Sequence, residues 1–290
     1  MMYPYDTTWE TVHPSLQEIG RWPLLLGQLH TRLAPYFARR EPHEHALSYL
    51  QAIVSEIPRK NSWQIAEQAR HARPYGMQRL LSQAVWDHEG VRNELRSLVV
   101  ETLSPCAQET VTPEAPFPVL ALDESGFPKR GSKSAGVAQQ YCGARGEVAN
   151  CQMGVFLSYV TARGHSLIDR ELYLPDVWTS DAARREGAHI PTSVDFATKP
   201  QLGCRMLQRA LDAGVPVCWV VADTVYGHSS QLRFWLEDHG LSFALAVPSL
   251  EAVCVRTPQG ARICLAGAVP SLLLGPHDWH PLSMYLGTKG

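Results

Sequence analysis

Two aspartates stand where carboxylates can do metal chemistry. Asp123 directly follows the apolar run 119–122, and Asp223 directly follows the apolar run 216–222. Short apolar runs of this kind predict buried strands, and functional groups of open α/β sheets gather beyond the carboxyl ends of strands. Aspartate is unfavourable inside a strand, so each position needs a reason. One reason is an ordinary turn or helix cap, and the other is a site for hard cations.

The second reason leads to a specific chemistry. Mg²⁺ takes oxygen ligands and is usually held by one or two carboxylates together with substrate phosphates. Two such ions about 4 Å apart can hold the attacking and the leaving oxygen of a phosphodiester displacement. If the strands that precede Asp123 and Asp223 are neighbours in the sheet, the two carboxylates face each other. The strand ends by themselves favour the ordinary caps, because aspartate is common at turns and caps, and the metal site stays open as the alternative.

The order of the predicted strands and helices that position these aspartates indicates the fold. Strands are predicted at 119–123, 148–161, 166–174, 216–222, 243–247 and 252–256, and helices at 180–186, 201–213 and 229–239. Three strands in a row followed by α/β crossovers predict a mixed sheet with helices on its faces. This is the order of a ribonuclease-H-like α/β fold, in which the first and fourth strands are neighbours.

The preceding residues predict an all-helical region. Apolar stripes with helical spacing run through 44–57, 63–69, 77–84 and 91–99, and Asn61 or Ser62 is placed to cap the second helix. The proline-rich segment 112–118 predicts a linker, which gives a helical region at 1–115 and an α/β domain at 116–290. Residues 62–86 have the size of a helix-turn-helix, with three arginines nearby. Either its second helix enters a DNA major groove, or the segment is a plain helical bundle.

The charge is low overall and locally uneven. The formal net charge of −2 argues against a protein that is basic throughout, but it leaves room for local basic patches. Lys129, Arg130 and Lys133 follow Asp123 in a Gly/Ser-rich loop and are predicted to hold DNA phosphates close to the metals. The alternative is a solvated loop tip.

Cysteine usage and hydropathy limit the class of protein. The seven cysteines include no C-x-x-C pair, which predicts reduced thiols in a cytoplasmic protein rather than a zinc site. No apolar stretch approaches the roughly 18 residues that a membrane helix needs. We therefore expect a cytoplasmic protein without a membrane partner.

Several sequence blocks, in the same order, resemble a family of insertion-sequence transposases of the DDE superfamily. They read DESGFPKRG at 123–131, QQY at 139–141, NCQMGV at 150–155, DRELYLP at 169–175, FATKP at 196–200 and ADTVYG at 222–227. The resemblance implies that Asp123 and Asp223 are catalytic metal ligands, the first two members of an acidic triad that holds two Mg²⁺ or Mn²⁺ ions. It also implies cleavage and strand transfer at insertion-sequence ends, with transposon-end DNA, target DNA and a second copy of the chain as partners.

The chain departs from this family at the third acid. The family's glutamate lies on a helix downstream of an inserted β-rich segment, and this sequence ends at a point that resembles the inside of that insertion. Glu251 and Asp278 are the only acids after the strand predicted at 243–247, and neither is assigned to the role. Two hypotheses remain: a transposase truncated before its third acid, or a non-catalytic DNA-binding remnant that occupies ends or pairs with an intact transposase. Whether the chain is an active enzyme is left open.

Overall fold

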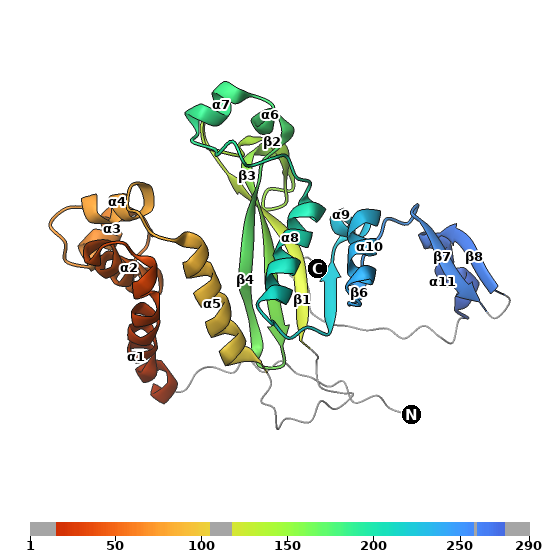
Figure 1. Cartoon of the computed structure of the whole chain (residues 1–290), viewed down its shortest axis with the longest axis horizontal. Helices are drawn as coiled ribbons and strands as arrows, with labels where there is room; N and C mark the ends of the chain where they lie inside the picture. Colours follow the sequence, from red (N-terminus) through yellow and green to blue (C-terminus); the bar gives the residue numbers. More distant parts are fainter. Residues whose placement is uncertain (1–15, 105–117, 258–259, 276–290) are drawn as a thin grey trace. The chain divides into compact units, whose positions relative to one another are not determined.

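The computed structural model describes residues 16–104, 118–257 and 260–275 (Figure 1). The chain divides into two compact units, Met1–Leu95 and Arg96–Gly290, and the division lies inside helix α5 (His88–Leu103). The predicted linker at 112–118 lies almost wholly outside the described residues. The domain boundary near residue 115 therefore stays a prediction. Within the described ranges, no helix combines the length and the hydropathy that crossing a membrane requires.

The N-terminal unit is built from helices, as predicted. In chain order they are α1 (Leu16–Leu33), the 3-10 turn η1 (Ala34–Tyr36), α2 (Arg40–Ile53), α3 (Ser62–Gln68) and α4 (Tyr75–Ser82). Asn61 caps α3, because its side-chain oxygen accepts the N–H groups of Trp63 and Gln64 at 3.0 Å each. Ala52, Ile65, Ala66 and Met77 form the core that holds α2, α3 and α4 together.

The second unit carries a six-stranded sheet. Its strands are β1 (Val119–Pro128), β2 (Ala138–Cys142), β3 (Glu147–Thr161), β4 (Gly164–Tyr173), β5 (Trp219–Ala222) and β6 (Ser242–Leu245). β3 pairs antiparallel with β1, β2 and β4, whereas β5 pairs parallel with β1, and β6 parallel with β5. The resulting order β4-β3-β1-β5-β6 is that of a ribonuclease-H-like mixed sheet, which confirms the predicted fold class. A separate hairpin joins β7 (Ala252–Thr257) to β8 (Gly260–Leu265).

Two features of the sheet differ from the prediction. β1 does not end at Asp123 but continues to Pro128, because β3 goes on pairing with it as far as Cys151. β2 is absent from the predicted strands. It is a short strand at the sheet edge with polar Gln139 and Gln140, so it carries almost no apolar signal and forms only because β3 offers it a free edge.

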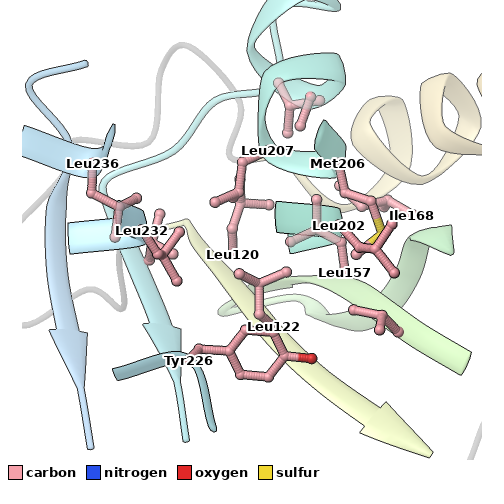
Figure 2. Close-up of a cluster of buried hydrophobic side chains, with 14 of the residues drawn as sticks. Leu120, Leu122, Leu157, Ile168, Leu202, Met206, Leu207, Tyr226, Leu232 and Leu236 are labelled. Atoms are coloured by element: carbon pink, nitrogen blue, oxygen red, sulfur yellow. The ribbon is translucent and has the colours of Figure 1, made fainter. Parts of the chain in front are cut away.

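Helices α8 (Lys199–Asp212) and α10 (Ser230–Asp238) cover one face of the sheet (Figure 2). Thr198 and Gln201 form a capping box that fixes where α8 begins. The buried side chains beneath the two helices are Leu120, Leu122, Leu157, Leu202, Met206, Leu207, Leu232 and Leu236. Gly203 lets α8 come close to the sheet, since a Cβ there would lie 3.0 Å from Leu122 Cδ1.

A buried ion cluster ties α8 to β4. A register shift between Leu157 and Ser158 of β3 lets both Ile168 and Asp169 of β4 be buried. Arg209 of α8 meets Asp169 Oδ2 at 2.9 Å and Glu171 Oε1 at 2.7 Å. Because Asp169 is almost fully buried, placing its carboxylate there costs free energy, which the pair with Arg209 offsets.

We expect the α8–sheet contact to dominate the stability of the second unit. Leu207→Ala removes a fully buried side chain and should lower the free energy of unfolding by about 2–5 kcal/mol. Leu167→Ala is the matched control, because Leu167 is 57% exposed, and its effect should be below about 1 kcal/mol. Urea unfolding followed by circular dichroism measures both, and equal effects would contradict the packing described.

Candidate active site

Asp123 and Asp223 occupy corresponding positions on two neighbouring strands. The last residues paired between the parallel strands β1 and β5 are Leu122 and Ala222, and each aspartate comes next in its chain. Neighbouring strands lie about 4.8 Å apart, so the two side chains start from adjacent points of the sheet. Both residues are exposed. The tertiary structure thus brings together two acids that are far apart in the sequence.

The two aspartates also share a face of the sheet. Leu120 and Leu122 are buried toward α8, so alternation directs Asp123 to the opposite face. Asp223 still has extended backbone (φ −79°, ψ −171°), and alternation from the buried Val220 directs it to that opposite face as well. Both carboxylates therefore leave the sheet on the side away from α8.

Each carboxylate uses one oxygen within the protein. Asp123 Oδ1 accepts the N–H of Glu124 at 2.7 Å, and Asp223 Oδ1 accepts the N–H of Val225 at 3.0 Å, which caps helix α9 (Thr224–Gly227). Asp223 is therefore a helix cap, as one of the two interpretations of its position proposed. No hydrogen bond from the described part of the chain reaches the other oxygen of either carboxylate. Two exposed carboxylates, each with an available oxygen, are a donor set that fits a hard divalent cation.

The residues that the structure describes hold no group of three His, Cys, Asp or Glu side chains spaced to bind a metal ion together. Glu251, which the sequence left unassigned, instead pairs with His228 Nδ1 at 2.7 Å and Arg233 Nη1 at 3.5 Å. Asp278 lies outside the described residues. The candidate site in the described ranges thus consists of the aspartate pair and the groups that support it.

Gly227 fixes the turn that carries Asp223. A Cβ at Gly227 would overlap the carbonyl oxygen of Ala246, so only glycine allows this close approach. Ala246 in turn donates its N–H to the carbonyl oxygen of Ala222 at 3.0 Å. The turn after β5 is therefore pressed against the end of β6, and the position of Asp223 follows from it.

A lysine–glutamate pair lies beneath Asp123, on the α8 side of the sheet. Glu124 Oε1 is 2.6 Å from the Nζ of Lys199, and the two side chains are only 15% and 21% exposed. The sequence assigned a catalytic function to neither residue. The sequence did contain a feature that could have predicted the pair. Lys199 is the first residue of α8, where the helix dipole disfavours a cation. A lysine at that position is therefore expected to have an acidic partner.

Tyr226 connects the two aspartate-bearing segments. It lies in the turn that follows Asp223, and its side chain is fully buried near Gly203. Burial raises the pKa of the Tyr226 hydroxyl, the charge of Glu124 raises this pKa further, and Asp123 and Asp223 add smaller increases. The charges of three carboxylates thus act on one hydroxyl. Neither the hydroxyl oxygen nor Glu124 Oε2 has a hydrogen-bond partner among the described residues, although both are buried.

The basic loop lies farther from the aspartates than predicted. Lys129, Arg130 and Lys133 are exposed, and Asn150 anchors the loop by donating to the carbonyl oxygens of Lys129 and Gly131 at 2.8 Å each. Lys129 follows Asp123 by six residues of extended strand, a distance of about 20 Å. Placement close to the metal ligands was therefore wrong, because β1 continues past Asp123. At this distance, beyond a screening length of about 10 Å, the loop cannot offset the charge of the aspartates.

We expect Lys199 and Glu124 to depend on each other. Lys199→Met leaves a mostly buried carboxylate without its cation and should lower the free energy of unfolding by about 1–3 kcal/mol. The double variant Lys199→Met/Glu124→Gln should recover part of this loss, because the uncompensated charge is gone. Arg40→Met is the control, since its pair with Glu44 is exposed and should contribute less than about 0.5 kcal/mol. Additive effects in denaturant titrations would rule out the coupling.

Comparisons with known proteins agree with this arrangement. Residues 32–262 match the family described as DDE superfamily endonuclease. A protein of Microchaete diplosiphon, described as a probable transposase for insertion sequence element IS701, is 25% identical over 206 residues, which cover 70% of this chain and 49% of that protein. The chain thus spans about half the length of this curated relative.

A solved structure, the Drosophila P element transposase strand transfer complex, matches 74% of this chain and 42% of its own, at 12% identity and a TM-score of 0.21. A score this low adds nothing to the fold, which the strand order already defines. The family match covers most of the chain, including β1 with Asp123 and the turn with Asp223. The chain belongs to the DDE superfamily of endonucleases, the superfamily that includes insertion-sequence transposases.

Proposed function

We propose that this protein is a DNA transposase whose Asp123 and Asp223 are catalytic residues that bind Mg²⁺ or Mn²⁺ for DNA strand cleavage and strand transfer. One observation carries the proposal: the two aspartates start from adjacent points of β1 and β5, on one face of the sheet, and each has an oxygen available. Membership of the DDE superfamily supports the reaction class.

We assign separate functions to the aspartates, which would bind the cations, and to the basic loop, which would contact DNA phosphates. Asp123 and Asp223 would hold the cations, two of them in the complete site, which when bound supply Lewis acidity and a more acidic water or hydroxyl. The sheet keeps the two carboxylates at a fixed separation, and the exposed face leaves room for a DNA strand. Lys129, Arg130 and Lys133 would contact phosphates about six nucleotides from the reacting one, since 20 Å spans that number at about 3.4 Å each.

The partners that we propose are transposon-end DNA, target DNA and a second copy of the chain. The name of the Microchaete relative includes an insertion sequence. This description concerns that protein, and we extend it to this chain because the chain belongs to the DDE superfamily. Because the chain covers about half of the relative, its ability to cleave is tested separately from its ability to bind metal.

Metal binding is the first test. Titration of the full chain with Mn²⁺, followed by calorimetry or paramagnetic resonance, should show saturable binding that Asp123→Asn and Asp223→Asn each weaken at least about tenfold, because each removes one charged ligand. Asp212→Asn, at the far end of α8, is the matched control and should bind as the parent does. Equal binding by all four proteins would refute the assignment of the ligands.

Cleavage is the second test. The chain should nick supercoiled DNA in Mg²⁺ or Mn²⁺ but not in EDTA, and Asp123→Asn or Asp223→Asn should reduce the rate at least about a hundredfold, since the reaction relies on both ligands. Metal binding without any cleavage would overturn the catalytic proposal. It would favour the alternative hypothesis, a DNA-binding remnant that occupies ends or pairs with an intact transposase.

A further inference from the structure

An exposed imidazole held by a mostly buried carboxylate lies in the turn that follows Asp223. His228 Nδ1 is 2.7 Å from Glu251 Oε2, and the two side chains are 72% and 16% exposed. A carboxylate can only accept a hydrogen bond, so His228 donates from Nδ1, and its other ring nitrogen, Nε2, is directed away from Glu251. Within the described ranges, no hydrogen bond engages Nε2. The pair thus presents one ring nitrogen to solvent in a fixed orientation.

Glu251 is itself held in place from two sides. Its Oε1 lies 3.5 Å from Nη1 of Arg233 on α10, and Arg233 also donates to the carbonyl oxygen of Gly227, the residue before His228. The backbone carbonyl of Glu251 accepts the N–H of Ala266 at 2.8 Å. An ion pair with one exposed partner contributes little to stability by itself. A carboxylate anchored in this way therefore indicates that the direction of the imidazole ring has a function.

His228 lies on the outer side of its turn, close to Asp223. It follows Asp223 by five residues, which is an axial rise of about 7 Å along α9. Tyr226 of the same turn is buried against α8, and two further residues rotate the chain by about 200°, so His228 points away from this core.

The turn also places His228 beside the last strand of the sheet. α9 lies next to β6 and α10 (Figure 1), and Gly227 is in close contact with Ala246 at the end of β6. Across the sheet in the order β1, β5, β6, Asp123 thus comes first, Asp223 second and His228 third. A DNA strand that crosses the aspartates toward β6 would pass the exposed Nε2.

We propose that His228, oriented by Glu251, binds a phosphate of the DNA strand about two nucleotides from the phosphate that reacts at the aspartates. The rise of about 7 Å between Asp223 and His228 spans this number at about 3.4 Å each. An imidazole with protons on both nitrogens donates one to Glu251 and the other to a phosphate oxygen. Its positive charge is then favoured by an anion on each side.

This inference rests on the proposed function, because it requires a DNA strand at the aspartates. It adds a phosphate contact on the β6 side of the site, whereas the basic loop follows the end of β1. It also assigns a role to Glu251, which orients the substrate-binding ring and does not bind a cation. Glu251 is thus a positioning residue.

The test is binding of the full chain to a short labelled duplex of arbitrary sequence, measured by fluorescence anisotropy in Ca²⁺ at several salt concentrations. Ca²⁺ takes oxygen ligands as Mg²⁺ does, and gel electrophoresis checks that the duplex stays intact. His228→Ala should bind about three- to tenfold more weakly, because one charge-assisted phosphate contact is lost. The slope of log K against log salt should become shallower by about 0.9, the value for one phosphate.

Two further variants control for charge and for histidine loss in general. His228→Lys keeps a cation at this position and should retain the slope of the parent chain. His165→Ala removes another exposed histidine of the same unit, at the start of β4 and beside the amino-terminal end of β1, and should bind as the parent does. An equal effect of His165→Ala and His228→Ala would contradict the inference.

Glu251→Gln separates orientation from simple charge. Removing an acid should by itself strengthen binding to DNA, since its repulsion of phosphates is lost. If Glu251 orients His228 and favours its charge, the variant should instead bind about two- to tenfold more weakly. In His228→Ala/Glu251→Gln the loss should not exceed that of His228→Ala, because the two residues act together. Tighter binding by folded Glu251→Gln would reject its positioning role.

Circular dichroism checks that each variant is folded. Unchanged affinity and slope in folded His228→Ala would overturn the inference, as would a parent chain that does not bind DNA in Ca²⁺. In cleavage assays with Mg²⁺, His228→Ala should raise KM about three- to tenfold and change kcat little. A fall in kcat at unchanged KM would place His228 in the chemical step and overturn the phosphate contact.

Mn²⁺ titration keeps this inference apart from the proposed function. His228→Ala should bind Mn²⁺ as the parent does, and loss of Mn²⁺ binding would make His228 a metal ligand and reject the phosphate contact. If Asp123→Asn and Asp223→Asn bind Mn²⁺ like the parent, the metal assignment fails, whereas a shallower salt slope in His228→Ala still supports the phosphate contact. If the aspartate variants lose Mn²⁺ and His228→Ala keeps full DNA binding, only the inference about His228 fails.

Discussion

The parallel pairing of β1 with β5 is the constraint on which the candidate site depends. These strands are joined through β2, β3, β4 and the crossover helix α8, and α8 packs across the sheet that they form. Leu202, Met206 and Leu207 cover the leucines of β1, and Gly203 allows the close approach. Without that packing, the position of Asp223 relative to Asp123 would have no structural basis. The apolar contact on one face thus sets the geometry of the polar groups on the other.

Because side chains alternate between the two faces of a strand, the consecutive acids Asp123 and Glu124 lie on opposite faces of the sheet. Asp123 leaves the sheet toward solvent, whereas Glu124 points into the space beneath α8, where it meets Lys199. A carboxylate in such a place costs free energy unless a cation accompanies it. Two exposed carboxylates at adjacent points have the opposite need, because they repel each other until a cation from solution joins them. Tyr226 lies between these surroundings, close enough for all three acids to raise the pKa of its hydroxyl.

The net charge of the whole chain does not describe how charged residues are distributed locally. A net charge of −2 describes neither the aspartate pair nor the basic loop that follows β1. Cations in this protein lie in three different surroundings. Arg209 and Lys199 compensate buried acids, Arg40 pairs with an exposed acid, and Lys129, Arg130 and Lys133 are exposed in one loop.

The sequence by itself determined the fold class and which acids matter as candidates. Apolar runs, a helix cap and the order of elements were sufficient, because burial on one face and helix capping leave periodic, local signals. Asn61 as a cap and the sheet order followed from such signals and were confirmed. The resemblance of ordered sequence blocks indicated the superfamily, which the family match confirmed.

Only the tertiary structure decided where the supporting groups lie. The continuation of β1 beyond Asp123 depends on the length of β3, a partner distant in the sequence, so the basic loop could not be placed from local pattern. Trp219 belongs to the apolar run 216–222 but is 41% exposed, because alternation places it on the face away from α8. The Lys199–Glu124 pair joins segments whose separation along the chain carries no periodic signal. Contacts between segments that are distant in the sequence are determined by packing, and local sequence patterns do not predict them.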